Sequence, residues 1–351
     1  MHALVMDFAK TFDKVSHSIL ISKLIRANLD PIIVRWISNF LSNRFQRTVI
    51  EGVQSKSLSV TSGVPQGSVL GPFLFLIFIN DISESLQHCT IRLFADDALA
   101  YMTIRNNGDQ ISFQSDINKL AEWATSNQMQ FNIDKCHITK FCMHKNKNTS
   151  DVPYNYSLYS KNLKCVDSFK YLGVTISNNL KWDQHIDNIT SKASQKLGMM
   201  KSALYKAPEK VKLIAYITFC RSILDYAAEI WDPYLNRQVE HLEQVQRKAV
   251  RFICNMKGRQ DSVSEKLEQL KLMPLKQRRK TSRIKLMLRI LGNSAHSSLA
   301  KSFDKLVACD SKTNVQTRSA TKELPPALAA SNSFLHNSFV HRTLRDLRLY
   351  M

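Results

Sequence analysis

Two adjacent aspartates between apolar runs constrain this chain more than any other feature of its sequence. The alternation of Thr90–Tyr101 predicts a tight β-hairpin that carries Asp96 and Asp97 at its turn. A third acid, Asp7, ends the apolar run Ala3–Met6, which predicts a buried strand. Carboxylates beside buried strands are costly unless a cation neutralises them. The sequence therefore predicts either a cation site or a solvated turn at these acids.

Carboxylate oxygens at strand ends suit hard divalent cations such as Mg²⁺ or Mn²⁺. Two such ions about 3.5–4 Å apart can activate a 3′-hydroxyl and stabilise the leaving oxygen in phosphoryl transfer. An Asp-Asp pair by itself is more often a solvated turn, because Asp is common in turns. The motifs around the acids decide between these interpretations.

Five motifs occur in order along residues 1–176. The first runs from Asp7 to His17 (DFAKTFDKVSH), the second from Ser62 to Pro72 (SGVPQGSVLGP), and the third is Phe94–Asp97 (FADD). Residues 121–136 and 171–176 (YLGVTI) supply the fourth and fifth. Together they resemble the palm motifs of reverse transcriptases from non-LTR, LINE-like retrotransposons. Residues 216–234 and 242–249 further resemble the helical region of jockey- and CR1-type elements.

The resemblance implies an RNA-directed DNA polymerase. Such an enzyme transfers a nucleotide from a deoxynucleoside triphosphate to the 3′-hydroxyl of a DNA primer on an RNA template, with two Mg²⁺ or Mn²⁺ ions. Asp7, Asp96 and Asp97 would be the catalytic metal ligands. Lys135 would protonate the departing pyrophosphate or hold its charge. A solvated surface lysine is the alternative for Lys135.

The resemblance also implies four substrate-binding residues. Phe12 would lie beneath the incoming sugar and exclude a 2′-hydroxyl, the alternative being a plain core aromatic. Pro65, Gln66 and Gly67 would line the nascent base pair, where glycine lets the backbone approach closely. Pro65 could equally be only a turn residue.

Two further residues of the first motif are expected to be structural. Asp13 is expected to cap a helix that begins near Val15. His17 has no evident partner in the sequence and is expected to pack or cap.

The basic charge is concentrated in the second half of the chain. The net charge is +20, and residues 1–150 hold 15 Lys/Arg against 12 Asp/Glu. Residues 151–351 hold 34 Lys/Arg against 17 Asp/Glu. Such an excess indicates a polyanionic partner.

The densest basic run lies between residues 271 and 289, with eight Lys/Arg and no acid. Lys276, Arg279, Lys280 and Arg283 are predicted to form one helical face that binds nucleic acid in a salt-dependent way. The alternative is a solvated helix of ordinary charge.

The fold class is predicted to be α+β, with a boundary near residue 180. Residues 1–180 are expected to form the palm of a right-hand polymerase, an antiparallel sheet with packed helices. Residues 181–309 are expected to be a helical, basic, thumb-like region, and residues 310–351 a tail. The family's fingers region, which precedes the first motif, is expected to be largely missing. The expected helices are 17–29, 31–43, 69–82, 110–126, 184–205, 209–230, 235–256, 263–271 and 275–291.

Other features limit the remaining classes. The seven cysteines are widely spread and include no C-x-x-C pair, which indicates free thiols. The longest apolar run, Phe73–Ile79, is too short to span a bilayer, so no membrane partner is predicted. Nuclear, intracellular action is implied only by the resemblance, and the oligomeric state is not indicated.

Two alternatives to a working polymerase are open. One is an inactive retrotransposon remnant that only binds nucleic acid, since the fingers are expected to be missing. The other is a structural or regulatory protein that kept the palm fold. The intact acids of the three motifs argue against the second alternative.

Overall fold

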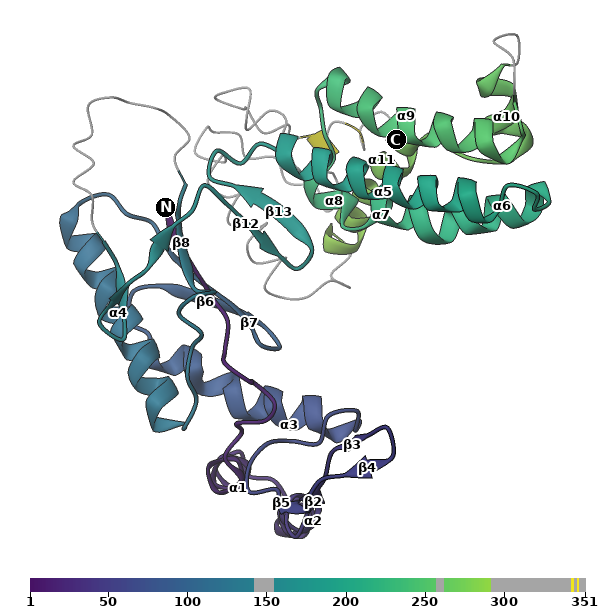
Figure 1. Cartoon of the computed structure of the whole chain (residues 1–351). Helices are drawn as coiled ribbons and strands as arrows, with labels where there is room; N and C mark the ends of the chain where they lie inside the picture. The colour runs from purple at the N-terminus through teal and green to yellow at the C-terminus, as the bar shows by residue number, and fades with distance from the viewer. Residues whose placement is uncertain (142–154, 257–261, 292–341, 344–345, 347–351) are drawn as a thin grey trace, which may run out of the picture. The chain divides into compact units, whose positions relative to one another are not determined.

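The computed structural model describes residues 1–141, 155–256 and 262–291, together with Arg342, Thr343 and Asp346 (Figure 1). The chain divides into two compact units, Met1–Lys181 and Trp182–Met351. This division falls beside the boundary that the sequence placed near residue 180. Most of the expected tail, 310–351, lies outside the described residues. The expectation about a fingers region concerns residues that would precede the first motif, so it stays a prediction.

The first unit is built on a five-stranded sheet with the apolar run before Asp7 as its central strand. β1 (His2–Met6) is antiparallel to both of its neighbours, β7 (Asp97–Met102) and β8 (His137–Lys140), whereas β11 (Lys164–Cys165) runs parallel to β8. The hairpin of β6 and β7 confirms the one predicted around the paired aspartates. In order across the sheet, the strands are β11 (Lys164–Cys165), β8 (His137–Lys140), β1 (His2–Met6), β7 (Asp97–Met102) and β6 (Thr90–Phe94).

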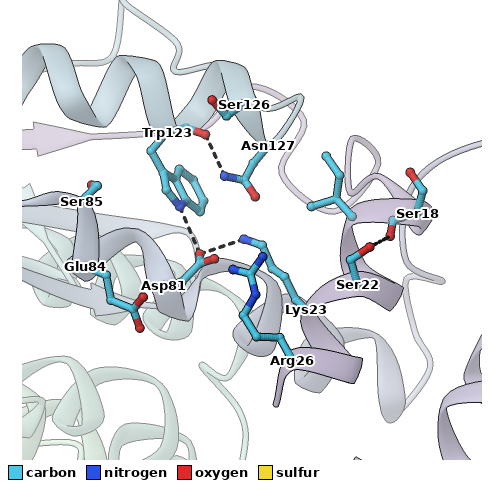
Figure 2. A pocket seen from close by; sticks show the side chains of 11 residues that line it. Ser18, Ser22, Lys23, Arg26, Asp81, Glu84, Ser85, Trp123, Ser126 and Asn127 are labelled. Carbon is cyan, nitrogen blue, oxygen red and sulfur yellow. Dashed lines mark hydrogen bonds and ion pairs between the residues drawn. The ribbon is translucent and has the colours of Figure 1, made fainter. Parts of the chain in front are cut away.

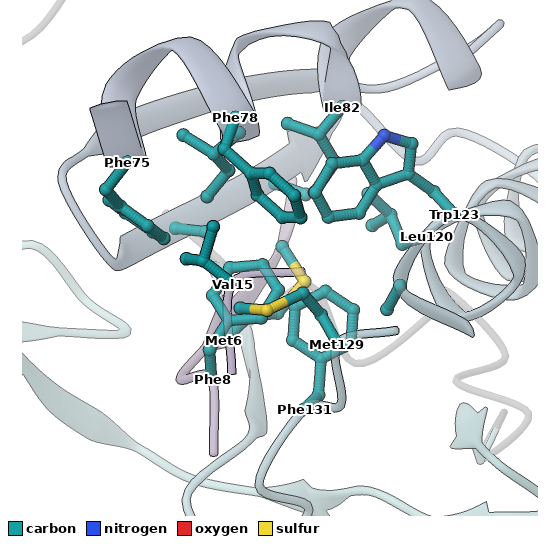
Figure 3. Packing of buried hydrophobic residues seen from close by; sticks show 14 of the residues in the cluster. Met6, Phe8, Val15, Phe75, Phe78, Ile82, Leu120, Trp123, Met129 and Phe131 are labelled. Carbon is teal, nitrogen blue, oxygen red and sulfur yellow. The ribbon is translucent and has the colours of Figure 1, made fainter. Parts of the chain in front are cut away.

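Two helices pack on this sheet, α3 (Leu70–Ile79) and α4 (Asn107–Ser126). Their side chains meet those of β1 and of the loop before β8 in a continuous core (Figure 3). Phe78 of α3, Leu120 of α4 and Met6 of β1 are almost fully buried. Each such side chain contributes about 1.5–3 kcal/mol on burial, so the core fixes the sheet beneath the motifs.

The predicted buried helix 69–82 is only partly confirmed. The α-helix ends at Ile79 and continues as a 3-10 helix, η1 (Asn80–Ser85). Val69 and Phe73 are 98% and 56% exposed, so one face of the segment is open. Composition alone could not show this, because apolar residues occur on all sides of the segment.

A buried lysine links four helical segments beside this core (Figure 2). Lys23, on α1 (His17–Arg26), donates to the Phe78 carbonyl at 2.7 Å and to the Asp81 carboxylate at 2.8 Å. The indole of Trp123 on α4 donates to the same carboxylate at 3.1 Å. Burial lowers the pKa of Lys23, although Asp81 opposes that shift.

Short elements complete the first unit. α2 begins at a proline and is capped by Asp30, whose side chain accepts from the Ile32 amide. Two short antiparallel pairs, β2 with β5 and β3 with β4, lie between α2 and α3 in the sequence. These elements are α2 (Pro31–Leu41), β2 (Phe45–Gln46), β3 (Val49–Ile50), β4 (Val53–Gln54), β5 (Leu58–Ser59), β9 (Ser157–Leu158), β10 (Lys161–Asn162), β12 (Ser168–Tyr171) and β13 (Val174–Ser177).

The second unit is helical, as expected, but its second predicted helix is interrupted. The segment 209–230 contains a π-helical turn, and Ala227 adopts a left-handed φ of 51°. Periodicity does not reveal either feature, because the apolar spacing continues through both. The elements are α5 (Asp183–Ala203), α6 (Glu209–Ala215), η2 (Tyr216–Arg221), α7 (Ser222–Asp225), α8 (Ala228–Trp231), α9 (Asn236–Ile253), α10 (Val263–Gln269) and α11 (Leu275–Leu291).

Helix α5 packs against α9 and the π-helical turn around an apolar core. The Tyr216 hydroxyl within it donates to Gln246 at 3.0 Å. None of the helices in the described part of the chain is both long and apolar enough to cross a membrane. The five described cysteines are free thiols, as predicted, and Cys142 and Cys309 lie outside the described residues.

The predicted nucleic-acid-binding face of α11 is wrong for two of its four residues. Arg279 and Arg283 are 0% and 2% exposed, and both contact the Asp232 carboxylate, at 2.9 and 3.1 Å. Arg283 also pairs with Asp346, as does Lys280 at 3.3 Å. Lys276 is exposed. The sequence of this basic run contains no acid. It therefore gives no sign that carboxylates distant in sequence neutralise its cations.

We expect Asp232→Ala to lower the free energy of unfolding by about 3–5 kcal/mol, because it leaves two buried guanidinium groups without their shared carboxylate. Urea unfolding followed by circular dichroism measures this. Asp187→Ala is the control, since its carboxylate is 69% exposed and should contribute about 0–1 kcal/mol. Equal effects of the two substitutions would contradict a structural role for Asp232.

Candidate active site

Strand pairing brings the three predicted acids to one end of the sheet. The register of β1 and β7 ends with Met6 opposite Ala98, so the next residue, Asp7, adjoins Asp97 across the strands. Asp97 in turn pairs with Phe94 in the hairpin. The turn of that hairpin therefore consists of the two intervening residues, 95 and 96. The pairing thus places Asp96 beside the other two acids.

The turn itself needs unusual backbone geometry. Ala95 adopts a left-handed φ of 51°, which is uncommon for a residue with a side chain. Two-residue hairpin turns favour such conformations because they match the twist of the strands. The backbone at residues 95 and 96 therefore forms a tight turn with Asp96 at its tip.

The three carboxylates act on one another electrostatically. Burial raises the pKa of Asp97, and the nearby charges of Asp96 and Asp7 raise it further. Like charges this close favour protonation or a neutralising cation. The local charge therefore suits binding of a positive group.

Lys135 lies against the first of these acids. Its Nζ is 2.9 Å from Oδ2 of Asp7, and the hydrogen bond and charge of that acid raise the pKa of the lysine. The turn that carries Lys135 is bonded to the same strand, because the Asn132 amide donates to the Asp7 carbonyl at 2.8 Å. The structure thus brings Lys135 to the acids, although its ammonium is largely exposed.

The donor set fits hard divalent cations, because it consists of carboxylates with mutually opposing charges. Within the described residues, no group of three or more His, Cys, Asp or Glu side chains is arranged as a ready-made metal site. Asp7 instead contacts an ammonium group. Asp7, Asp96 and Asp97 are the residues that could hold a metal here.

The second motif forms a loop against the turn after Asp7. Gly67 has a φ of +82°, a conformation that favours glycine, and it is exposed. The side-chain amide of Gln66 donates to Oδ1 of Asp13 at 2.9 Å. Pro65 is half-buried, and its carbonyl accepts from the Ser68 hydroxyl at 2.7 Å. The loop therefore presents the three predicted substrate-binding residues beside the first motif.

Phe12 is half-buried at the edge of the core. Its ring centroid lies 5.0 Å from that of Phe75 on α3. This packing supports the side chain from below and leaves part of its ring open. A role at the incoming sugar stays a prediction.

The expectation that Asp13 caps a helix was wrong, and His17, expected to pack or cap, has a hydrogen-bond partner. The residue before α1 is Ser16, and its side chain makes no capping bond, whereas Asp13 bonds Gln66. Nε2 of His17 donates to the Gly63 carbonyl at 2.8 Å. Both partners lie in the second motif, about fifty residues away, so local sequence reasoning could not find them.

A polar cavity of about 560 Å³ lies beside this loop. Two of its lining cations, Lys10 and Arg44, have no ion-pair partner among the residues that the structure describes, and sequence reasoning did not select them. Lys10 belongs to the first motif and could have been noted there. The other lining residues are Asp13, Gln46 and the run 59–66.

The geometry agrees with the match to known families. The family described as reverse transcriptase (RNA-dependent DNA polymerase) matches residues 1–176, half of the chain. This chain therefore belongs to the reverse transcriptase family.

Relatives come from mobile elements. The RNA-directed DNA polymerase from mobile element jockey of Drosophila melanogaster is 26% identical over 260 residues, covering 71% of this chain and 28% of the relative. Its counterpart in Drosophila funebris is 27% identical over 263 residues, with the same two coverages. The probable RNA-directed DNA polymerase from transposon BS of Drosophila melanogaster is 26% identical over 265 residues, covering 72% and 29%. This chain thus spans less than a third of these relatives.

Likeness to solved structures is looser. Apo telomerase from Candida tropicalis aligns with a TM-score of 0.41 and 11% identity, over 76% of this chain and 43% of that one. A likeness at this level carries no argument beyond the family match.

We expect Asp97→Asn to stabilise the metal-free fold above the range in which Asp97 titrates. A folded-state pKa above the ordinary value means that the folded chain binds the proton more tightly, so this group's contribution to stability falls as pH rises through that pKa. The two proteins should therefore converge in acid and diverge toward neutral pH.

Thermal unfolding in EDTA from about pH 3 to about pH 7 measures this difference. Glu122→Gln, at an exposed position on α4, is the control and should not alter the pH dependence. A variant that is less stable than the parent at neutral pH would contradict the view that ionised Asp97 destabilises the metal-free fold.

Proposed function

We propose that this chain carries the nucleotide-adding centre of an RNA-directed DNA polymerase from a non-LTR retrotransposon. The supporting observation is the meeting of Asp7, Asp96 and Asp97 at one end of the β1–β7 pair. The first unit would serve as the palm and the helical second unit as a thumb-like region. Action on chromosomal DNA would place the protein in the nucleus.

The proposed chemistry assigns each residue a task. Two divalent ions, Mg²⁺ or Mn²⁺, would activate the primer 3′-hydroxyl and stabilise the leaving pyrophosphate when bound. The three aspartates would hold these ions. Lys135, 2.9 Å from Asp7, stands where it could give a proton or a positive charge to the departing group.

The remaining predicted residues would select the deoxynucleoside triphosphate. Phe12, supported by Phe75, would exclude a 2′-hydroxyl from the sugar position. Pro65, Gln66 and Gly67 would line the base pair formed between the template and the incoming nucleotide. Their loop is hydrogen-bonded to the turn that follows Asp7, an arrangement that would couple nucleotide binding to the metal ligands.

The template–primer duplex needs exposed cations, and α5 offers them. From Asn188 to Pro208 the chain contains no acid. Lys192 and Lys196 lie one helical turn apart and are exposed, without an ion-pair partner in the described part of the chain. Tyr205, 72% exposed, follows them. We propose that this surface contacts nucleic-acid phosphates in place of the buried arginines of α11. The other exposed lysines of this acid-free run are Lys201 on α5 and Lys206 just after it.

We expect weak primer extension on an RNA template that requires Mg²⁺. Asp96→Asn should lower it by at least about 100-fold, because loss of a metal ligand removes several kcal/mol of transition-state stabilisation. A gel assay with labelled DNA primer measures this, with Glu122→Gln as the exposed control. Retained RNA–DNA binding without any Mg²⁺-dependent extension would contradict the proposal and favour an inactive, nucleic-acid-binding remnant.

We expect Lys192→Gln with Lys196→Gln to weaken duplex binding and to reduce the slope of log K against log salt by about 1.8, because each phosphate contact contributes about 0.9. Fluorescence anisotropy with an RNA–DNA duplex at several salt concentrations measures the slope. The control is Lys248→Gln with Arg251→Gln on α9, an exposed pair with the same charge change. Equal losses of slope for the two pairs would contradict the α5 surface.

A further inference from the structure

The loop that carries Gln66 is bonded directly to the turn that follows Asp7. We name these segments the Gly63 loop (residues 62–67) and the Asp7 turn (residues 8–16). The amides of Gly63 and Val64 donate to the carbonyls of Val15 and Phe12 at 2.8 and 2.9 Å. The Ser62 hydroxyl donates to the Asp13 carbonyl at 2.9 Å. The backbone of the two motifs is therefore joined edge to edge.

Gly63 allows this close approach. Its φ is +88°, and a Cβ there would lie 2.8 Å from the Asp13 carbonyl oxygen and 2.9 Å from that of Phe12. Backbone atoms on both sides cannot move away as a flexible side chain would. The position of the loop is thus set by the position of the turn.

Two side chains add the remaining constraints. His17 donates from Nε2 to the Gly63 carbonyl at 2.8 Å, so the ring carries its proton on that nitrogen. Asp13 accepts from the Gln66 amide at 2.9 Å and so fixes the orientation of that amide. His17 belongs to the first turn of α1, which the core holds through Leu20 and Leu24. The hydrogen bond from His17 therefore fixes the loop relative to α1, which the core holds in place.

We infer that Asp13 and His17 are positioning residues that hold the Gly63 loop where its nucleotide contacts require it, an inference that rests on the proposed polymerase function. Both contacts lie at the surface of the unit, where Asp13 is exposed and His17 half-buried. Such contacts contribute little to global stability. Their loss should loosen one loop and leave the fold intact. It should weaken nucleotide binding more than it slows the chemical step.

Hydrogen exchange of the full chain tests the loop without any need for activity. His17→Ala and Asp13→Ala should each raise amide exchange across residues 62–68 by about fivefold, the effect of losing one hydrogen bond. Exchange in β1 and β7 should not change, which shows that the sheet is intact. His17→Gln and Asp13→Asn retain the donor and the acceptor, so they should restore slow exchange in the loop.

Single-nucleotide incorporation tests the consequence for the substrate. The alanine variants should raise the KM for the deoxynucleoside triphosphate by about fivefold and change kcat by less than about twofold, because uniform binding is lost. Unchanged loop exchange in the alanine variants, or no restoration by the conservative ones, would overturn the inference. Failure of the unsubstituted chain to incorporate any nucleotide would instead contradict the polymerase proposal, because the exchange experiment needs no substrate.

Discussion

The register between β1 and β7 is the constraint on which the rest of the first unit depends. Met6 opposite Ala98 places Asp7 beside Asp97, and the two-residue turn adds the third acid. Because side chains alternate along a strand, a slip of one residue would turn the apolar side of β1 to the wrong face. Packing of the core residue Met6 therefore fixes the alignment that also sets the position of its neighbour Asp7.

Charge is balanced differently in the two units. In the first, burial and then the neighbouring charges of Asp96 and Asp7 raise the pKa of Asp97, so a cation would stabilise these carboxylates. In the second, Asp232 neutralises Arg279 and Arg283 inside the protein. Isolated buried charges are costly, so Asp232 is paired inside the protein, whereas the acids of the first unit are partly exposed and one of them contacts Lys135.

Several elements could be predicted from sequence because their signals are local. The alternation around Asp96 and Asp97 predicted the hairpin, and the apolar run before Asp7 predicted β1, both confirmed. Helical spacing predicted α4, α5, α9 and α11 within a few residues. The match of residues 1–176 to the reverse transcriptase family confirms what the ordered motifs indicated. Local patterns sufficed here because strand and helix periods are written in neighbouring residues.

The sequence by itself determined the family, the order of the motifs and the three acids. Only the tertiary structure decided which charges are exposed and which polar groups meet. Arg279 resembles a surface cation in sequence and is buried against Asp232, while His17 and Asp13 find partners in the distant Gly63 loop. The physical reason is that burial and hydrogen bonding depend on contacts between segments far apart in the chain, which local periodicity does not encode.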